Sequence, residues 1–175
     1  MVKIPSAKIT DLDLLRCVAI EKNEILISTG MSTEEEIVLA IETIYKTRKR
    51  NNIPLELVVM GCNSSYPTDD QEVNLLSLLT LKHLSEMLKI PFSLGFSSHS
   101  PSPYPAIYST FFDVRYIEVH YTLDRTLPGT DQAASLESHG LELLARESKR
   151  IPKLLGDGTL QVFESEKGPR AKLRG

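Results

Sequence analysis

The chain has 175 residues, of which 41% are hydrophobic and 25% charged, and these totals are typical of one folded domain and exclude an intrinsically disordered chain. A formal net charge of −3 provides no basic surface for nucleic acid, and no run of about 18 apolar residues predicts a membrane span. Two cysteines are too few for a disulfide framework, and no signal peptide is recognisable, so we expect a cytoplasmic protein with neither nucleic-acid nor membrane partners.

Short β-branched runs alternate with longer segments of helical period along the chain. A helical pattern follows each of the predicted strands, which cover residues 2–4, 24–28, 55–61, 92–97 and 114–120. This alternation is typical of repeated βα units around a parallel sheet. The sequence therefore predicts an α/β fold with about five βα units.

Three of the predicted helices have recognisable ends or apolar faces. Ser32 and Glu35 have the spacing of a capping box, and the helix that follows, to Arg50, presents an apolar face of Ile37, Val38, Ile41, Ile44 and Tyr45. The basic residues at its end are interpreted as a solvated surface, namely Lys46, Arg48, Lys49 and Arg50. The next helix presents Leu76, Leu79, Leu84, Met87 and Leu88. The last is expected to stop at Pro152.

Residues 154–175 follow the last predicted helix and are rich in helix-breaking residues, including Gly156, Gly158, Gly168 and Pro169. Glycine and proline interrupt regular structure, so this segment is predicted to be an extended tail or linker. The sequence thus divides into a folded part, residues 1–153, and a tail, residues 154–175.

The alternation of side chains along the later strands separates a polar face from an apolar one. Tyr116, Glu118 and His120 share one face of the last strand, and Ser93, Gly95 and Ser97 share one face of the strand before it. An open doubly wound sheet buries both faces under helices, whereas a barrel tolerates polar inward positions near the strand tops. We therefore predict a partial (β/α) TIM barrel, because a complete one has eight strands and takes about 250 residues.

Polar residues collect where the predicted strands end. Ser28, the run 62–66, the run 97–99 and His120 all lie at such positions, where the active sites of barrel enzymes are built. Because neighbouring strands lie about 4.8 Å apart, His99 and His120 can reach one ion together. The alternative is that one or both histidines only satisfy loop carbonyls.

Two further groups of residues are candidates for chemistry at the strand ends. Lys3, Ser6 and Ser28 can hold a phosphate or carboxylate by charge-assisted hydrogen bonds, although a single lysine is more often a surface charge. Cys62 shares the parity of Val58 and Met60, which we assign to the outer face, so a packed core thiol is predicted there rather than a nucleophile.

Several ordered motifs resemble the sialic acid synthase family, and the resemblance covers residues 3–173. The motifs are Lys3-Ile4-Pro5-Ser6, Ile27-Ser28-Thr29-Gly30-Met31, Tyr66-Pro67-Thr68, Val73-Asn74-Leu75, Ile117-Glu118-Val119-His120-Tyr121-Thr122-Leu123-Asp124, Leu127-Pro128-Gly129-Thr130-Asp131 and Ser135-Leu136-Glu137.

The resemblance implies a barrel enzyme that condenses phosphoenolpyruvate with N-acetylmannosamine, or a related N-acylated hexosamine, to a sialic acid. It implies a divalent ion, Mn²⁺ or Mg²⁺, held by His99 and His120. The implied phosphoenolpyruvate contacts are Lys3, Ser6, Ser28, Ser64 and Ser97, with Asn63 as the substitute if the loop shifts by one residue. Sugar contacts map onto Tyr66 and Asp131, and Glu118 is expected to orient the ligand or tune the charge of the site.

The sequence departs from the family pattern at two positions. Ser98 stands where the family usually has aspartate, and Gly61 stands where it often has histidine. The resemblance also implies earlier barrel strands before Lys3 and a small domain after Gly175. We therefore expect this chain to be weak or inactive alone, and to work as a homodimer or with a complementing half-barrel chain.

Two alternative hypotheses remain open at this stage. The first is a non-catalytic remnant or assembly module that pairs its open sheet edges with another chain. The second is a synthase for legionaminic acid, pseudaminic acid or a spore-coat sugar, because the residues that recognise the substituents of the sugar are mostly absent from this segment.

Overall fold

Five parallel strands form one sheet in chain order, β1-β2-β3-β4-β5, in the computed structural model, which describes residues 1–21 and 23–174. Lys22 and Gly175 lie outside the described residues. The strands are β1 (Val2–Ile4), β2 (Ile25–Ser28), β3 (Leu57–Cys62), β4 (Ser93–Ser98) and β5 (Tyr116–Val119). The helices are α1 (Leu12–Ala19), α2 (Glu34–Arg50), α3 (Ser77–Leu88), α4 (Tyr104–Ser109), α5 (Ser138–Leu155) and α6 (Glu164–Arg174). Short 3₁₀ turns are η1 (Ser6–Lys8), η2 (Asp70–Glu72), η3 (Thr110–Phe112) and η4 (Gln132–Ala134).

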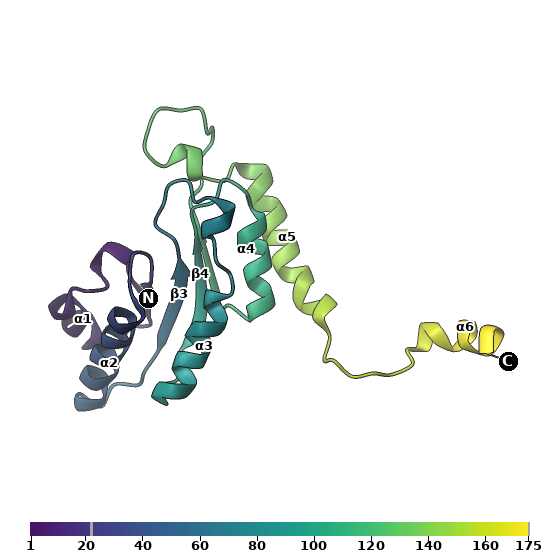
Figure 1. Cartoon of the computed structure of the whole chain (residues 1–175), viewed down its shortest axis with the longest axis horizontal. Coiled ribbons are helices and arrows are strands. Elements are labelled where there is room, and N and C mark those ends of the chain that lie inside the picture. Colours follow the sequence, from purple (N-terminus) through teal and green to yellow (C-terminus); the bar gives the residue numbers. More distant parts are fainter. Residues whose placement is uncertain (22, 175) are drawn as a thin grey trace.

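The two faces of the sheet have different partners. The outer face packs under helices, where the main core joins Ile27, Val59 and Phe96 to α1, α2 and α3, and a second core joins β5 to α4 and α5 (Figure 1). The inner face carries a small apolar cluster of Leu26, Val58, Met60 and Tyr116. Alternation along parallel strands places one set of side chains under the helices and the other set in a shared lumen.

The sheet is strongly curled. β1 and β5 are its two edges, and in a flat sheet they would lie about 19 Å apart, four strand spacings of about 4.8 Å. Yet Lys3 Nζ of β1 lies 3.0 Å from Glu118 Oε2 of β5. At the opposite end of the strands, the Tyr116 hydroxyl donates to Glu24 at 2.8 Å and Arg115 pairs with the same carboxylate at 3.0 Å. The predicted partial barrel is therefore confirmed.

Several local expectations are corrected by the structure. The capping box of α2 consists of Thr33 and Glu36, one residue later than predicted, because Thr33 has the extended backbone of an N-cap. Helix α3 buries Leu78, Leu81 and Leu84, while the predicted face residues Leu76, Leu79 and Met87 are exposed. The helix position was right, but a leucine-rich segment offers more than one apolar stripe.

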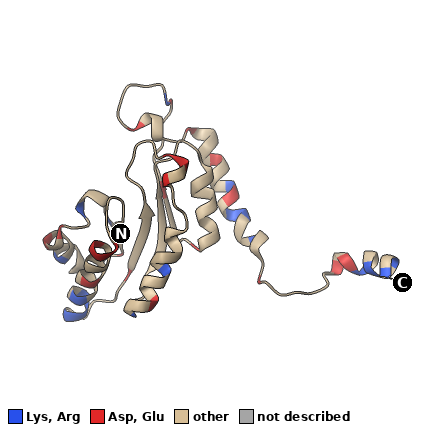
Figure 2. Ribbon diagram, in the orientation of Figure 1, with Lys and Arg blue, Asp and Glu red and all other residues tan. Residues whose placement is uncertain are grey.

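The C-terminal part is more helical than expected. Helix α5 continues past Pro152 to Leu155, because a proline in the last turn removes a single intrahelical bond, and it ends before Gly156 at φ +62°. The tail contains helix α6, which extends away from the body of the molecule (Figure 1). Acidic residues in its first turn and basic residues in its last turn complement the helix dipole (Figure 2).

Among the described residues, no helix is long and apolar enough to cross a membrane.

Arg48 is the exception in the basic cluster at the end of α2, which Figure 2 shows in blue. It is only 2% exposed, so its interpretation as a solvated residue was wrong. Its guanidinium donates to the backbone carbonyls of Pro54, Glu21 and Asn23, and thereby ties α2 to the loops that precede β2 and β3. The carbonyls of Glu21 and Asn23 come from a loop remote in sequence, so the helical pattern alone does not reveal them.

We predict that Arg48→Ala lowers the free energy of unfolding by about 2–4 kcal/mol, because it removes several charge-assisted hydrogen bonds and leaves carbonyls without donors. Urea denaturation followed by circular dichroism measures the change. The matched control is Arg50→Ala, whose side chain is exposed on the same turn and which should change stability by no more than about 0.5 kcal/mol. Equal effects of the two substitutions would contradict a structural role for Arg48.

Candidate functional site

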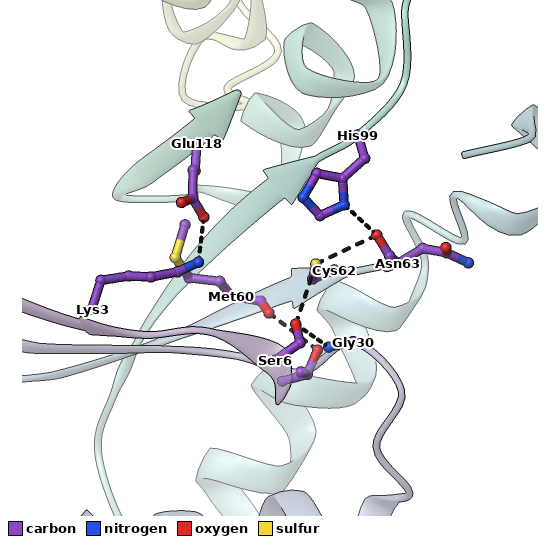
Figure 3. Close-up of polar contacts among 9 residues, drawn as sticks. Lys3, Ser6, Gly30, Met60, Cys62, Asn63, His99 and Glu118 are labelled. Carbon is purple, nitrogen blue, oxygen red and sulfur yellow. Dashed lines mark hydrogen bonds and ion pairs between the residues drawn. The ribbon is translucent and has the colours of Figure 1, made fainter. Parts of the chain in front are cut away.

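A cavity of about 350 Å³ opens at the carboxyl ends of the strands, and Figure 3 shows Lys3, Ser6, Cys62, His99 and Glu118 of its lining. Parallel strands end at the same rim, so residues far apart in the sequence meet there. The cavity contains most of the predicted site residues. It is lined by Lys3, Pro5, Ser6, Ala7, Met31, Cys62, Ser64, Tyr66, Ser97, His99, Glu118 and His120.

One cation and one carboxylate face each other across this cavity. Lys3 and Glu118 form the 3.0 Å ion pair described above, and both side chains are partly exposed (Figure 3). Burial raises the pKa of the Glu118 carboxyl, but hydrogen bonds from Lys3 and Ser97 outweigh burial and hold the pKa below its ordinary value. Glu118 is therefore a carboxylate at neutral pH and neutralises the lysine.

The serine hydroxyls lie where the loops after β1, β2 and β3 approach one another closely. Ser6 Oγ accepts a hydrogen bond from the Gly30 N–H at 3.1 Å. A Cβ atom on residue 30 would lie 2.2 Å from Ser64 Oγ, so only glycine allows Ser6 and Ser64 to approach this closely. Ser28 is completely buried at the end of β2, and its Oγ has no hydrogen-bond partner among the described residues. It shares the inner parity of Leu26, so a hydroxyl is available there for a ligand.

His99 and His120 lie beside each other, as predicted. Their ring centroids are 5.2 Å apart and the rings are nearly perpendicular, at 89°. His99 Nδ1 lies 2.6 Å from the Asn63 carbonyl oxygen, and His120 Nδ1 lies 3.5 Å from Asp131 Oδ2. The Tyr66 ring packs against both imidazoles, with centroids 4.0 and 5.5 Å away. One nitrogen of His99 thus contacts a loop carbonyl, as the alternative hypothesis expected. The other nitrogen, Nε2, takes no part in that contact.

The donor set fits a divalent ion held by two protein ligands. Metal-binding histidines usually engage their second nitrogen with a carbonyl or carboxylate, which orients the ring. The Asn63 carbonyl and the Asp131 carboxylate occupy these positions. No group of three or more His, Cys, Asp or Glu side chains that could hold a metal is found within residues 1–21 and 23–174. Water or substrate oxygens would therefore complete the coordination.

Asn63 and Ser64, the two candidate ligand contacts in the loop after β3, have different surroundings. Asn63 donates from its side-chain amide to the Glu72 carbonyl and accepts from the Ser65 N–H, so this amide is engaged within the loop. Ser64 lines the cavity instead. The side chain of residue 64 rather than 63 is thus available to a ligand, and Asn63 contributes its backbone carbonyl to His99.

Cys62 was wrongly assigned to the outer face. Its parity with Val58 and Met60 was correct, but those residues form the inner cluster, so the thiol faces the cavity. Ser6 Oγ lies 3.6 Å from Cys62 Sγ (Figure 3). Burial raises the pKa of the Cys62 thiol, but hydrogen bonds with His99 and Ser6 outweigh it, and the pKa lies below its ordinary value. Burial likewise lowers the pKa of His99, but the thiol and the Asn63 carbonyl raise it above the ordinary value.

A second groove, of about 410 Å³, lies on the outer side of the loop after β3 and is bordered by α2 and α3. Cys62 lines both cavities and Asn63 lines the outer groove, so this loop separates them. The outer groove is lined by leucines, hydroxyl residues and two glutamates, and it contains neither histidine nor lysine. We therefore place the candidate site in the inner cavity.

Residues 1–160 match the model of the NeuB family. The chain is 34% identical over 165 residues to N,N'-diacetyllegionaminic acid synthase of Campylobacter jejuni, a match that covers 94% of this chain and 47% of that protein. It is 31% identical over 162 residues to pseudaminic acid synthase of the same organism, covering 93% and 44%. The crystal structure of N-acetylneuraminic acid synthetase from Leptospira borgpetersenii in complex with citrate superposes with a TM-score of 0.81 at 32% identity, covering 99% of this chain and 58% of that one. The chain spans about half the length of the curated relatives it matches.

The lowered pKa of Cys62 predicts that alkylation by iodoacetamide extends to lower pH than for an ordinary cysteine, because the thiolate is the reactive form. His99→Gln removes a hydrogen bond that lowers this pKa, so the rate profile should move to higher pH. The measurement uses a Cys17→Ser background, because Cys17 is exposed, and His83→Gln on α3 is the matched control. A profile that does not respond to His99→Gln would contradict the contact.

Proposed function

This chain belongs to the NeuB family, and we propose that it forms the metal-binding part of a synthase that condenses phosphoenolpyruvate with N-acetylmannosamine or a related N-acylated hexosamine. The product is a nonulosonic acid of the sialic acid type. One observation carries the proposal: two imidazoles, a lysine and several serine hydroxyls line a single cavity at the strand ends. That set matches the charges of phosphoenolpyruvate and the carbonyl of an open-chain sugar.

The anionic substrate is proposed to lie against Lys3 and the serine hydroxyls. An ammonium group and hydroxyl donors bind phosphate or carboxylate by charge-assisted hydrogen bonds. Ser28 Oγ, which has no hydrogen-bond partner among the described residues, would gain one from the ligand, and Ser97 is similarly buried on the inner face of β4. Ser6 and Ser64 complete the cradle from the loops beside Gly30.

Bond formation is proposed to occur above the two histidines. A divalent ion on His99 and His120, Mn²⁺ or Mg²⁺, would act as a Lewis acid that polarises the sugar aldehyde. The methylene carbon of phosphoenolpyruvate bonds to the aldehyde carbon, water adds to the neighbouring carbon, and phosphate leaves by carbon–oxygen cleavage. Throughout these steps Lys3 stabilises the negative charge of the phosphate or carboxylate.

The sugar is proposed to contact Tyr66, Asp131 and Glu118. Tyr66 covers both imidazoles with an exposed ring, and Asp131 lies beside His120 on the loop after β5. Glu118 lies one pleat below His120 on the inner face, where it can orient a hydroxyl. The relatives are named for legionaminic and pseudaminic acids as well as for N-acetylneuraminic acid, so the proposal extends to the class of N-acylated hexosamines.

A second candidate function, a half-barrel module that pairs with another chain, is favoured by the sheet edges. β1 and β5 each have one neighbouring strand among the described residues. Unpaired edges of parallel strands are ready to accept a further strand. A second copy or a complementing chain bound at these edges would add side chains beside the cavity. Light scattering after size-exclusion chromatography separates a monomer from such an assembly.

We predict that the chain binds Mn²⁺ and that His99→Ala or His120→Ala weakens this binding by about tenfold or more. Electron paramagnetic resonance of free Mn²⁺ measures the affinity without requiring turnover. His83→Ala on the exposed surface of α3 is the control and should bind as the wild type does. If the His99 and His120 variants retain full affinity, the two-histidine site is wrong.

Lys3→Met is predicted to weaken binding of phosphoenolpyruvate by about tenfold, because it removes a charged donor to the ligand. Isothermal titration calorimetry measures the dissociation constant, and Lys82→Met on the exposed side of α3 is the matched control. Unchanged affinity in the Lys3 variant would exclude the proposed anion site. Turnover at ordinary enzyme rates by this chain alone would contradict the expectation that it is weak or inactive by itself.

A further inference from the structure

The cation and the carboxylate of the cavity neutralise each other in the ligand-free structure. We propose that Glu118 is a built-in counter-ion for Lys3, which an anionic ligand must displace before it can bind. The inference rests on the proposed anion site at Lys3 and adds a role for Glu118 that precedes any contact with the sugar. The ligand class is a phosphate or carboxylate.

The placement of the pair permits such an exchange. Lys3 and Glu118 come from the two edge strands and meet across the lumen at 3.0 Å, and Figure 3 shows both side chains extended toward each other. Their side chains are 31% and 36% exposed. Glu118 Oε2, the oxygen that faces Lys3, is buried but forms no hydrogen bond among the described residues, so the pair lacks the geometry of a strong ion pair. An incoming anion can therefore take the place of the carboxylate at low cost.

A second ion pair across the lumen has a structural role and can be compared with the Lys3–Glu118 pair. Glu24, at the other end of the strands, is paired with Arg115 at 3.0 Å and accepts from the Tyr116 hydroxyl at 2.8 Å. Its side chain is only 13% exposed. Two donors and deeper burial make this link the stronger connection between β2 and β5. The curl of the sheet does not depend on the Lys3–Glu118 pair alone, and that pair is free to open.

Glu118 stays in place when Lys3 turns to a ligand, because its backbone belongs to a paired strand. It lies in the middle of β5, opposite Ser97 in the register with β4. Lys3 is attached to a short edge strand and has no other acidic partner among the described residues. The lysine is therefore the member of the pair that moves to the ligand, and the carboxylate stays on the cavity wall.

The test measures binding of inorganic phosphate by NMR titration of the full chain, without metal or sugar. Glu118→Gln should bind phosphate about two- to fivefold more tightly than the wild type, the gain expected when a partly exposed pair no longer competes. Glu86→Gln on the exposed surface of α3 removes the same charge away from the cavity and should leave the affinity unchanged. In a Lys3→Met background, Glu118→Gln should bring no gain, because the two residues act as one pair.

The outcomes separate the counter-ion from the anion site. If phosphate binds the wild type and Glu118→Gln equally well, the counter-ion role is overturned while the anion site stands. A gain that persists in the Lys3→Met background would reflect general repulsion by the carboxylate and would also overturn it. If neither the wild type nor Glu118→Gln binds phosphate, the anion site fails as well. Circular dichroism of each variant verifies that the fold is retained.

Discussion

The candidate site depends on the curl of the five-stranded sheet. Without it, side chains of β1 and β5 would be separated by the width of three strands, and the lysine, the carboxylate and the histidines would not share a cavity. The curl requires small or flexible side chains on the inner face. Gly95 is an example, because a Cβ atom there would lie 2.8 Å from Met60 Cγ. The apolar floor of the lumen and the polar rim above it both follow from this narrow geometry.

Along the inner face, the side chains change from apolar to polar toward the carboxyl ends of the strands. Leu26, Val58 and Met60 fill the middle of the lumen and exclude water from the floor. Above them the same strands present hydroxyls, a thiol and a carboxylate, and the loops add the imidazoles. A polar group next to an apolar floor has a lower local dielectric than one at the surface, which strengthens its interactions with a bound charge. The polar groups are therefore concentrated at the strand ends, where ligands enter, and the apolar part of the lumen excludes water.

The sequence predicted the strands and most of the residues that line the inner cavity, for reasons that are local. β-Branched residues mark β1, β2, β3 and β5 but are absent from β4, and alternation along β4 and β5 correctly places Ser97 and Glu118 inward. Cys62 was misplaced because Val58 and Met60 look like core residues under a helix, whereas a barrel lumen is itself apolar below its rim. The burial of Arg48 was not predictable from the helix, since the carbonyls of Glu21 and Asn23 lie on a loop that only the tertiary fold brings beside it.

Strand parity gives a physical interpretation of Ser98 and Gly61, the two departures from the family pattern. Ser98 and Gly61 both lie on the outer face, opposite to Ser97 and Cys62. Ser98 is buried, and its hydroxyl accepts from the Ser100 N–H at 3.4 Å, so it supports the turn that leads out of β4. A Cβ atom on residue 61 would meet Leu78 of α3 at 3.0 Å rather than any residue of the cavity. Both substitutions therefore act on the packing behind the site, and the inner cavity retains its lysine, carboxylate, hydroxyls and paired imidazoles.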